Sequence, residues 1–71
     1  MGMASPKTKA EAREQIAKLQ GDIAREKVSL AYHKATFKGP NAAYGASQIM
    51  GRIADKKAKI AKLRAMIPSL P

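Results

Sequence analysis

The chain is predicted to reverse direction at Lys38-Gly39-Pro40-Asn41. Glycine accepts the left-handed backbone that often follows a helix, and proline cannot continue a helix that reaches it. Asn41 is suited to cap a new helix, because its side chain can accept a hydrogen bond from a free backbone N–H group. These residues therefore separate two helical segments, which we expect at about residues 8–37 and about residues 42–67.

The start of the first helix has two candidate caps. Thr8 is the preferred N-cap, because Glu11 three residues later completes a capping box. Ser5 followed by Pro6 is the alternative, since proline is well suited to the first position of a helix. Gly21 is the one residue between this start and the turn that weakens the helix, at a cost of about 1 kcal/mol.

The second helix is predicted to stop at Pro68, which disfavours helical backbone in the residue before it. Gly45 lies in the first turns of this helix, so Ser47 is an alternative cap further along the chain. Residues 1–5 and 68–71 are expected to fray, as chain ends commonly do.

Large apolar side chains recur every seven residues in both segments, with further ones between them, as in a coiled coil. When the chain is folded back at the turn, the two stripes pair in antiparallel register along their whole length. The same register brings Glu26 opposite Lys56, where an ion pair would add little stability but would disfavour slipped alignments. We therefore predict an all-α protein, an antiparallel two-helix hairpin of the coiled-coil type, which forms one domain over residues 1–71. The predicted pairs in the seam are Ile16–Ile67, Leu19–Leu63, Ile23–Ile60, Leu30–Ile53, His33–Ile49 and Phe37–Ala46.

The chain carries 14 Lys and Arg residues against 5 Asp and Glu residues, a net charge of +9. Helical spacing of about 100° per residue places these charges on two unlike flanks of the seam. On one flank, acids of the first helix face bases of the second, and Asp22–Lys59 and Glu26–Arg52 are expected to be within reach. The other flank has no acid, and we interpret it as either a solvated face or a binding surface for an anionic partner. Its cations are Lys9, Arg13, Lys27, Lys34, Lys57 and Arg64, with Lys38 near its end.

Small side chains recur every seven residues beside this acid-free flank. They are either good helix formers with no further role or a surface that another helix can approach closely. A lone hairpin leaves apolar surface exposed, so two copies could pack as a four-helix bundle, and we expect a homodimer. The residues of this partner-helix or dimer face are Ala17, Ala24, Val28, Ala31, Met50, Ala54 and Ala61.

Several classes of site are not expected. The chain has no Cys and one His, which excludes disulfides and thiolate zinc sites, and His33 has no ligating side chain three or four residues away. There is no glycine-rich phosphate loop, and two helices cannot enclose a substrate, so we expect no enzyme activity, no metal and no cofactor. No apolar run approaches the roughly 18 residues needed to span a bilayer. We expect no membrane partner and a cytoplasmic location.

These features predict a small binding protein. The first hypothesis is nucleic-acid binding, in which the acid-free flank contacts phosphates with little sequence readout and a steep salt dependence. Tyr32 and Tyr44 are the only tyrosines, so aromatic stacking on bases is expected to contribute little. The alternative is an adaptor or inhibitor, for example a phage-type antagonist of a host protein, that docks its small-residue face on a partner helix within an acidic rim.

Overall fold

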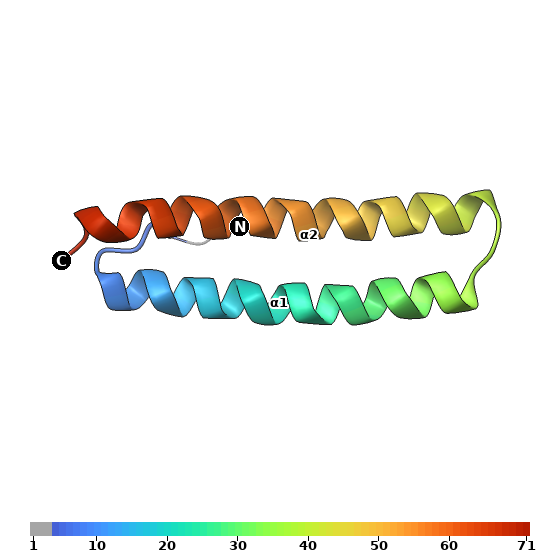
Figure 1. Cartoon of the computed structure of the whole chain (residues 1–71), viewed down its shortest axis with the longest axis horizontal. Coiled ribbons are helices and arrows are strands. Elements are labelled where there is room, and N and C mark those ends of the chain that lie inside the picture. The colour runs from blue at the N-terminus through green and yellow to red at the C-terminus, as the bar shows by residue number, and fades with distance from the viewer. Residues whose placement is uncertain (1–3) are drawn as a thin grey trace.

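A computed structural model describes residues 4–71 and shows two antiparallel α-helices joined by a short turn (Figure 1). Helix α1 spans Lys9–Thr36, helix α2 spans Pro40–Met66, and a 3₁₀ turn, η1, follows at Ile67–Ser69. The described residues contain no strand. Their Cα atoms extend over 50 × 20 × 15 Å, so the hairpin is long and narrow. The predicted all-α helical hairpin is confirmed.

The start of α1 is built as a capped helix at Thr8. The Thr8 hydroxyl accepts a hydrogen bond from the Glu11 N–H at 3.1 Å, and its backbone is extended (φ −134°, ψ 163°). The Glu11 carboxylate accepts in turn from the N–H of Lys7 at 2.7 Å, one residue before the cap. Thr8 is therefore confirmed as the N-cap, and the alternative start at Ser5 is not used.

The turn is tighter than predicted, because α2 begins at Pro40 instead of about residue 42. Gly39 is its N-cap, with a φ of 94° that glycine adopts without strain. Proline fits the first helical position, where its fixed φ is favourable and its missing N–H is not needed. Asn41 and Ser47 therefore lie inside the helix, and no side chain caps it, which corrects both candidate caps.

The core is a single seam between α1 and α2. Ala12, fully buried, extends the α1 stripe by one turn towards the N-terminus. At the other end, the prediction that Phe37 lies in the seam is wrong, because α1 stops at Thr36 and Phe37 is 50% exposed. Its predicted partner Ala46, and His33, are half-buried near the turn and are not part of the buried cluster. The other predicted stripe residues are confirmed in the core or packed against it. The buried cluster is Ile16, Leu19, Ile23, Ile49, Ile53, Ile60 and Leu63, with Leu30 and Ile67 packed against it.

Described residues near both ends of the chain make contacts towards the open end of the hairpin. The Lys9 N–H donates to the Pro71 carbonyl at 2.9 Å, and the Gln15 side-chain amide donates to the Ala4 carbonyl at 2.8 Å. Pro6 is buried in this arrangement. These contacts close the open end. The expected fraying of residues 68–71 and of residues 4 and 5 stays a prediction, and residues 1–3 lie outside the described part of the chain.

Candidate nucleic-acid interface

The basic face is a set of six cationic side chains on one flank of the hairpin. Four of them follow a seam residue by four positions, which displaces each one about 40° to the same side of its helix. Lys27, for example, follows Ile23 on α1, and Lys57 follows Ile53 on α2. Because the helices are antiparallel, these equal displacements point to the same flank. The members of the basic face are Lys9, Arg13, Lys27, Lys34, Lys57 and Arg64.

The cations of the basic face are free of acidic partners within residues 4–71. Five of the six are exposed, and Lys9 is half-buried. The ion pairs that form in this part of the chain use Lys18, Arg25, Arg52 and Lys56 instead. The positive charge on this flank is therefore available to an external anion.

The spacing along the basic face follows the heptad. Lys27 and Lys34 are seven residues apart on α1, and Lys57 and Arg64 are seven apart on α2, which is about 10.5 Å along each axis. This separation is close to the Debye length of about 8–10 Å at physiological ionic strength. The potentials of neighbouring cations therefore overlap and form a continuous positive stripe.

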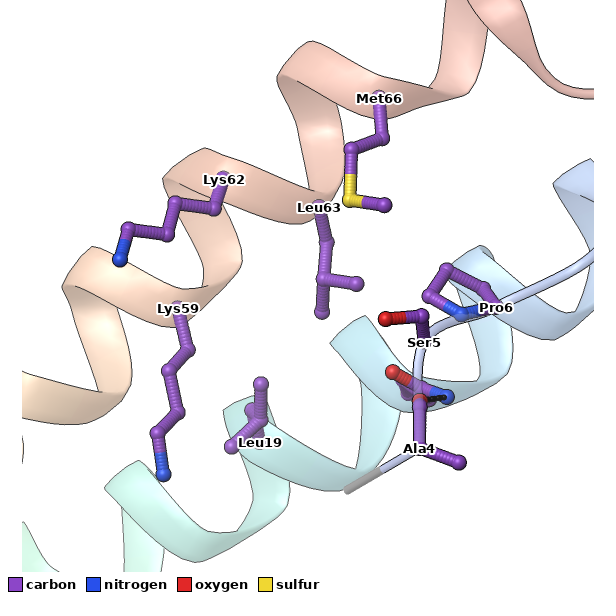
Figure 2. Close-up of a pocket in the computed structure, with 9 residues that line it drawn as sticks. Ala4, Ser5, Pro6, Leu19, Lys59, Lys62, Leu63 and Met66 are labelled. Atoms are coloured by element: carbon purple, nitrogen blue, oxygen red, sulfur yellow. Dashed lines mark hydrogen bonds between the residues drawn. The ribbon is translucent and has the colours of Figure 1, made fainter. Parts of the chain in front are cut away.

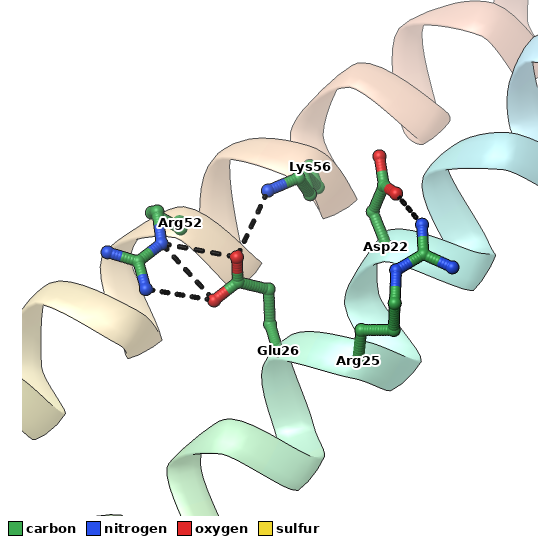
Figure 3. Close-up of polar contacts among 5 residues, drawn as sticks. All are labelled: Asp22, Arg25, Glu26, Arg52 and Lys56. Carbon is green, nitrogen blue, oxygen red and sulfur yellow. Dashed lines mark hydrogen bonds and ion pairs between the residues drawn. The ribbon is translucent and has the colours of Figure 1, made fainter.

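The opposite flank carries a cluster in which Glu26 pairs with two cations (Figure 3). Arg52 Nε lies 3.2 Å from both carboxylate oxygens, Arg52 Nη2 lies 3.1 Å from Oε2, and Lys56 Nζ lies 3.6 Å from Oε1. The Arg52 hydrogen bond, helped by the charges of Arg52 and Lys56, lowers the pKa of the Glu26 carboxyl against an opposing effect of desolvation. The predicted contacts of Glu26 with Arg52 and with Lys56 are both confirmed.

Asp22 does not pair with Lys59 as predicted. Its carboxylate binds the guanidinium of Arg25, three residues later on the same helix (Figure 3). Residues three apart on a helix surface are neighbours, so this partner is reached without a cross-helix contact. Since Arg25 also lies off the basic face, the acidic charge of Asp22 is neutralised on its own side of the molecule.

A groove of about 310 Å³ lies at the turn end of the basic face. The Phe37 ring stands beside it with its centroid 4.8 Å from that of His33 and the two planes tilted by 41°. His33 Nε2 is 2.8 Å from the Ala42 carbonyl oxygen, which fixes the imidazole across the helices. The sequence placed both residues in the seam. His33 does lie between the helices, whereas the early end of α1 turns Phe37 towards this groove. The lining residues are His33, Lys34, Phe37, Lys38, Gly39, Ala42, Ala43 and Ala46.

The small-residue face is not brought together as one surface. Its alanines follow seam residues by one position, so they lie about 100° from the seam on each helix, beyond the cations of the basic face. The two rows of alanine are therefore separated by the basic face. All of these residues are exposed, and Val28 and Met50 are the large apolar ones, at 71% and 50% exposure.

A second hollow, of about 220 Å³, lies at the open end of the hairpin (Figure 2). The N-terminal segment with Pro6 forms one side of it, and Leu19, Leu63 and Met66 form most of its apolar wall. Lys59 also lines it, three positions after Lys56 of the Glu26 cluster. This hollow therefore lies on the flank of the Glu26 cluster and does not extend the basic face.

Two kinds of feature are absent from residues 4–71. No helix in this part of the chain is long and apolar enough to cross a bilayer. No group of three His, Asp or Glu side chains there is arranged to hold a metal ion. Comparisons with protein-family models, with curated proteins and with solved structures gave no significant match to this chain.

Proposed function

We propose that this protein is a non-enzymatic binding protein whose basic face contacts the phosphates of nucleic acid. The observation that carries the proposal is the segregation of charge. Four of the five acids are held by a cap or an ion pair that uses no cation of the basic face, as at Glu11 and Glu26, and the fifth, Asp55, makes no ion pair within residues 4–71. The six cations of the basic face have no acidic partner within the same residues. A cytoplasmic location fits such a partner and is part of the proposal.

The chemistry of the basic face suits phosphate contacts without base readout. Lysine acts as a point charge, while Arg13 and Arg64 can donate two parallel hydrogen bonds to one phosphate. Six phosphate contacts would release bound counterions from the nucleic acid. A plot of log K against log salt concentration should then have a slope of about −5 for a duplex and about −4 for a single strand. Binding should therefore be strong at low salt and weak above physiological salt.

The test compares two double charge reversals with the same change in net charge. Lys27→Glu with Lys57→Glu removes two cations from the basic face, and Lys59→Glu with Lys62→Glu removes two from elsewhere on α2. Gel-shift titrations of a 30-nucleotide probe at two salt concentrations should show a strong loss for the first variant and a modest loss for the second. Equal losses would assign the binding to overall charge, and an unchanged affinity in the first variant would remove the proposal.

A second candidate function is docking to a protein partner through the small-residue face. The exposure of Val28 and Met50 favours it, since large apolar side chains on a surface often mark contact sites. In that case Ala24→Asp or Ala61→Asp would abolish the interaction, and salt would matter modestly. A second copy of the chain is one such partner, and light scattering would report the mass of a dimer. The separation of the alanine rows by cations disfavours this candidate relative to phosphate binding.

A further inference from the structure

We propose that the groove at the turn end of the basic face holds an unpaired nucleobase stacked on Phe37, so that single-stranded nucleic acid is the preferred partner. This inference rests on the proposed function, because it names which class of nucleic acid the basic face binds. It is carried by three features of the groove: an exposed aromatic ring, cations beside it, and continuity with the basic face.

The aromatic ring is Phe37, whose side chain is 50% exposed although it is the most apolar aromatic type. His33 packs near it at a centroid distance of 4.8 Å and a tilt of 41°, which supports the ring from within the hairpin. The backbone is also fixed, because the Phe37 N–H donates to the His33 carbonyl at 2.9 Å. A supported ring with a free surface is what a stacking base requires.

The surroundings of the ring match a nucleotide. Lys34 and Lys38 line the same groove and can contact the phosphates on either side of a stacked base. The residues contributed by α2 are alanines, which leave room for a flat group, and no acid is among the described residues that line the groove. A base in a duplex is already paired and stacked, so its face is not available to Phe37. The groove therefore distinguishes single strands from duplexes.

The groove also continues the basic face. Lys34 belongs to both, and Lys27 precedes it by about 10.5 Å along α1. A strand that follows these cations along the helix arrives at Phe37 at the turn. Tyr32 and Tyr44 are also exposed, at 65% and 67%, but neither lines this groove. They serve as matched controls for exposed aromatic side chains.

The first experiment uses tryptophan as a reporter, because the chain contains no Trp. Phe37→Trp and Tyr32→Trp are each titrated with oligothymidylate, with a duplex of equal length and with polyglutamate, at low salt. We expect oligothymidylate to quench the fluorescence of Phe37→Trp strongly and that of Tyr32→Trp weakly, with little quenching by duplex or polyglutamate. Equal quenching at the two positions, or equal quenching of Phe37→Trp by polyglutamate, would overturn the stacking site.

The second experiment removes the aromatic ring but keeps an apolar side chain. Phe37→Leu should weaken binding of oligothymidylate by about fivefold or more, which is the lower end for a lost base stack, and should leave duplex affinity unchanged. Tyr32→Leu is the control and should leave both affinities unchanged, and circular dichroism confirms that both variants are helical. If wild type binds with a steep salt dependence and Phe37→Leu binds oligothymidylate equally well, the stacking site is wrong and the proposed function stands. If wild type binds neither nucleic acid, both the stacking site and the proposed function are wrong.

Discussion

His33 of α1 lies so close to Gly45 of α2 that no side chain fits between the helices at that point. A Cβ atom added to Gly45 would be 2.6 Å from His33 Cε1 and 2.7 Å from Nε2. The imidazole is held in place by the Ala42 carbonyl at 2.8 Å and by the neighbouring Phe37 ring. Gly45, which the sequence presents as a weak point of a helix, therefore permits a close approach of the two helices.

Gly45→Ala is expected to destabilise the hairpin, although alanine is the better helix former. The higher helix propensity is worth about 1 kcal/mol, whereas forcing atoms into a filled space costs about 1–3 kcal/mol. We expect a net loss of about 1 kcal/mol, which lowers the melting temperature of a chain this small by about 4–8 °C. Thermal unfolding followed by circular dichroism measures it.

Gly51→Ala is the matched control on the same helix. A Cβ atom added to Gly51 meets nothing within 4 Å, so only the helix propensity changes. This variant should gain about 1 kcal/mol and melt at a higher temperature than wild type. If Gly45→Ala and Gly51→Ala stabilise the protein equally, the close contact with His33 is not present in solution.

The seam could be predicted from the sequence because several signals agree. Ile23, Ile53 and the other stripe residues repeat every seven positions in both helices, and the same register brings Glu26 to Lys56. A slip of one residue would break both patterns, so the pairing is strongly specified. The basic face could be predicted for the same reason, since the phase of each helix decides on which flank Lys27 and its neighbours lie.

The groove at the turn could not be predicted, because it depends on where α1 ends. If α1 were one residue longer, Phe37 would continue the helical stripe, but α1 ends at Thr36 and Phe37 leaves it. The exact residue at which a helix ends is poorly defined by the sequence pattern. The closure of the open end was missed for a related reason. The burial of Pro6 and the hydrogen bond from Lys9 to Pro71 depend on how segments far apart in the chain meet in space. The spacing of residues along the sequence does not predict such contacts.

The pH dependence of stability should report the Glu26 cluster. Because the pKa of Glu26 is lowered in the folded state below its ordinary value of 4.5, unfolding at low pH takes up a proton. The stabilisation is complete above that ordinary value and is lost as the pH falls through the lowered folded pKa. Melting temperatures from pH 7 to pH 2 should therefore fall less steeply for Glu26→Gln than for wild type. Glu14→Gln, at an exposed site, should retain the steep wild-type dependence.

The seam should tolerate little loss of volume. Ile53 is 8% exposed in the centre of the buried cluster, and Ile53→Ala removes its contacts and leaves a cavity. Such changes typically cost about 2–5 kcal/mol, a large part of the stability of a domain this small. We expect loss of cooperative thermal unfolding or a melting temperature lowered by more than 10 °C. Val28→Ala, at a side chain 71% exposed, should melt within about 2 °C of wild type, and equal effects of both changes would contradict the seam.

Thr8→Ala should show how much the N-cap contributes. The change removes the hydrogen bond from the Glu11 N–H to the Thr8 hydroxyl, and such caps are worth about 1 kcal/mol. The melting temperature should fall by about 4–8 °C. Thr36→Ala is the control at the other end of α1, where the side chain is exposed and caps nothing, and it should change the melting temperature little. A matching fall in both variants would show that the Thr8 hydroxyl makes no special contribution.

The basic face should lower the stability of the free protein while it provides the binding surface. Lys27 and Lys57 each follow a residue of the Glu26–Lys56 contact by one position, so we expect them to lie at nearly the same level on the opposite flank and to repel each other. Lys27→Gln removes this repulsion, and Lys27→Glu replaces it with attraction, so the melting temperature at low salt should rise by a few degrees in that order. High salt should make the melting temperatures of the three proteins more alike, because it screens exposed charges. The same two variants should bind nucleic acid progressively more weakly, so that stability and affinity change in opposite directions. If Lys27→Glu melts below wild type at low salt, the two lysines do not face each other across the seam.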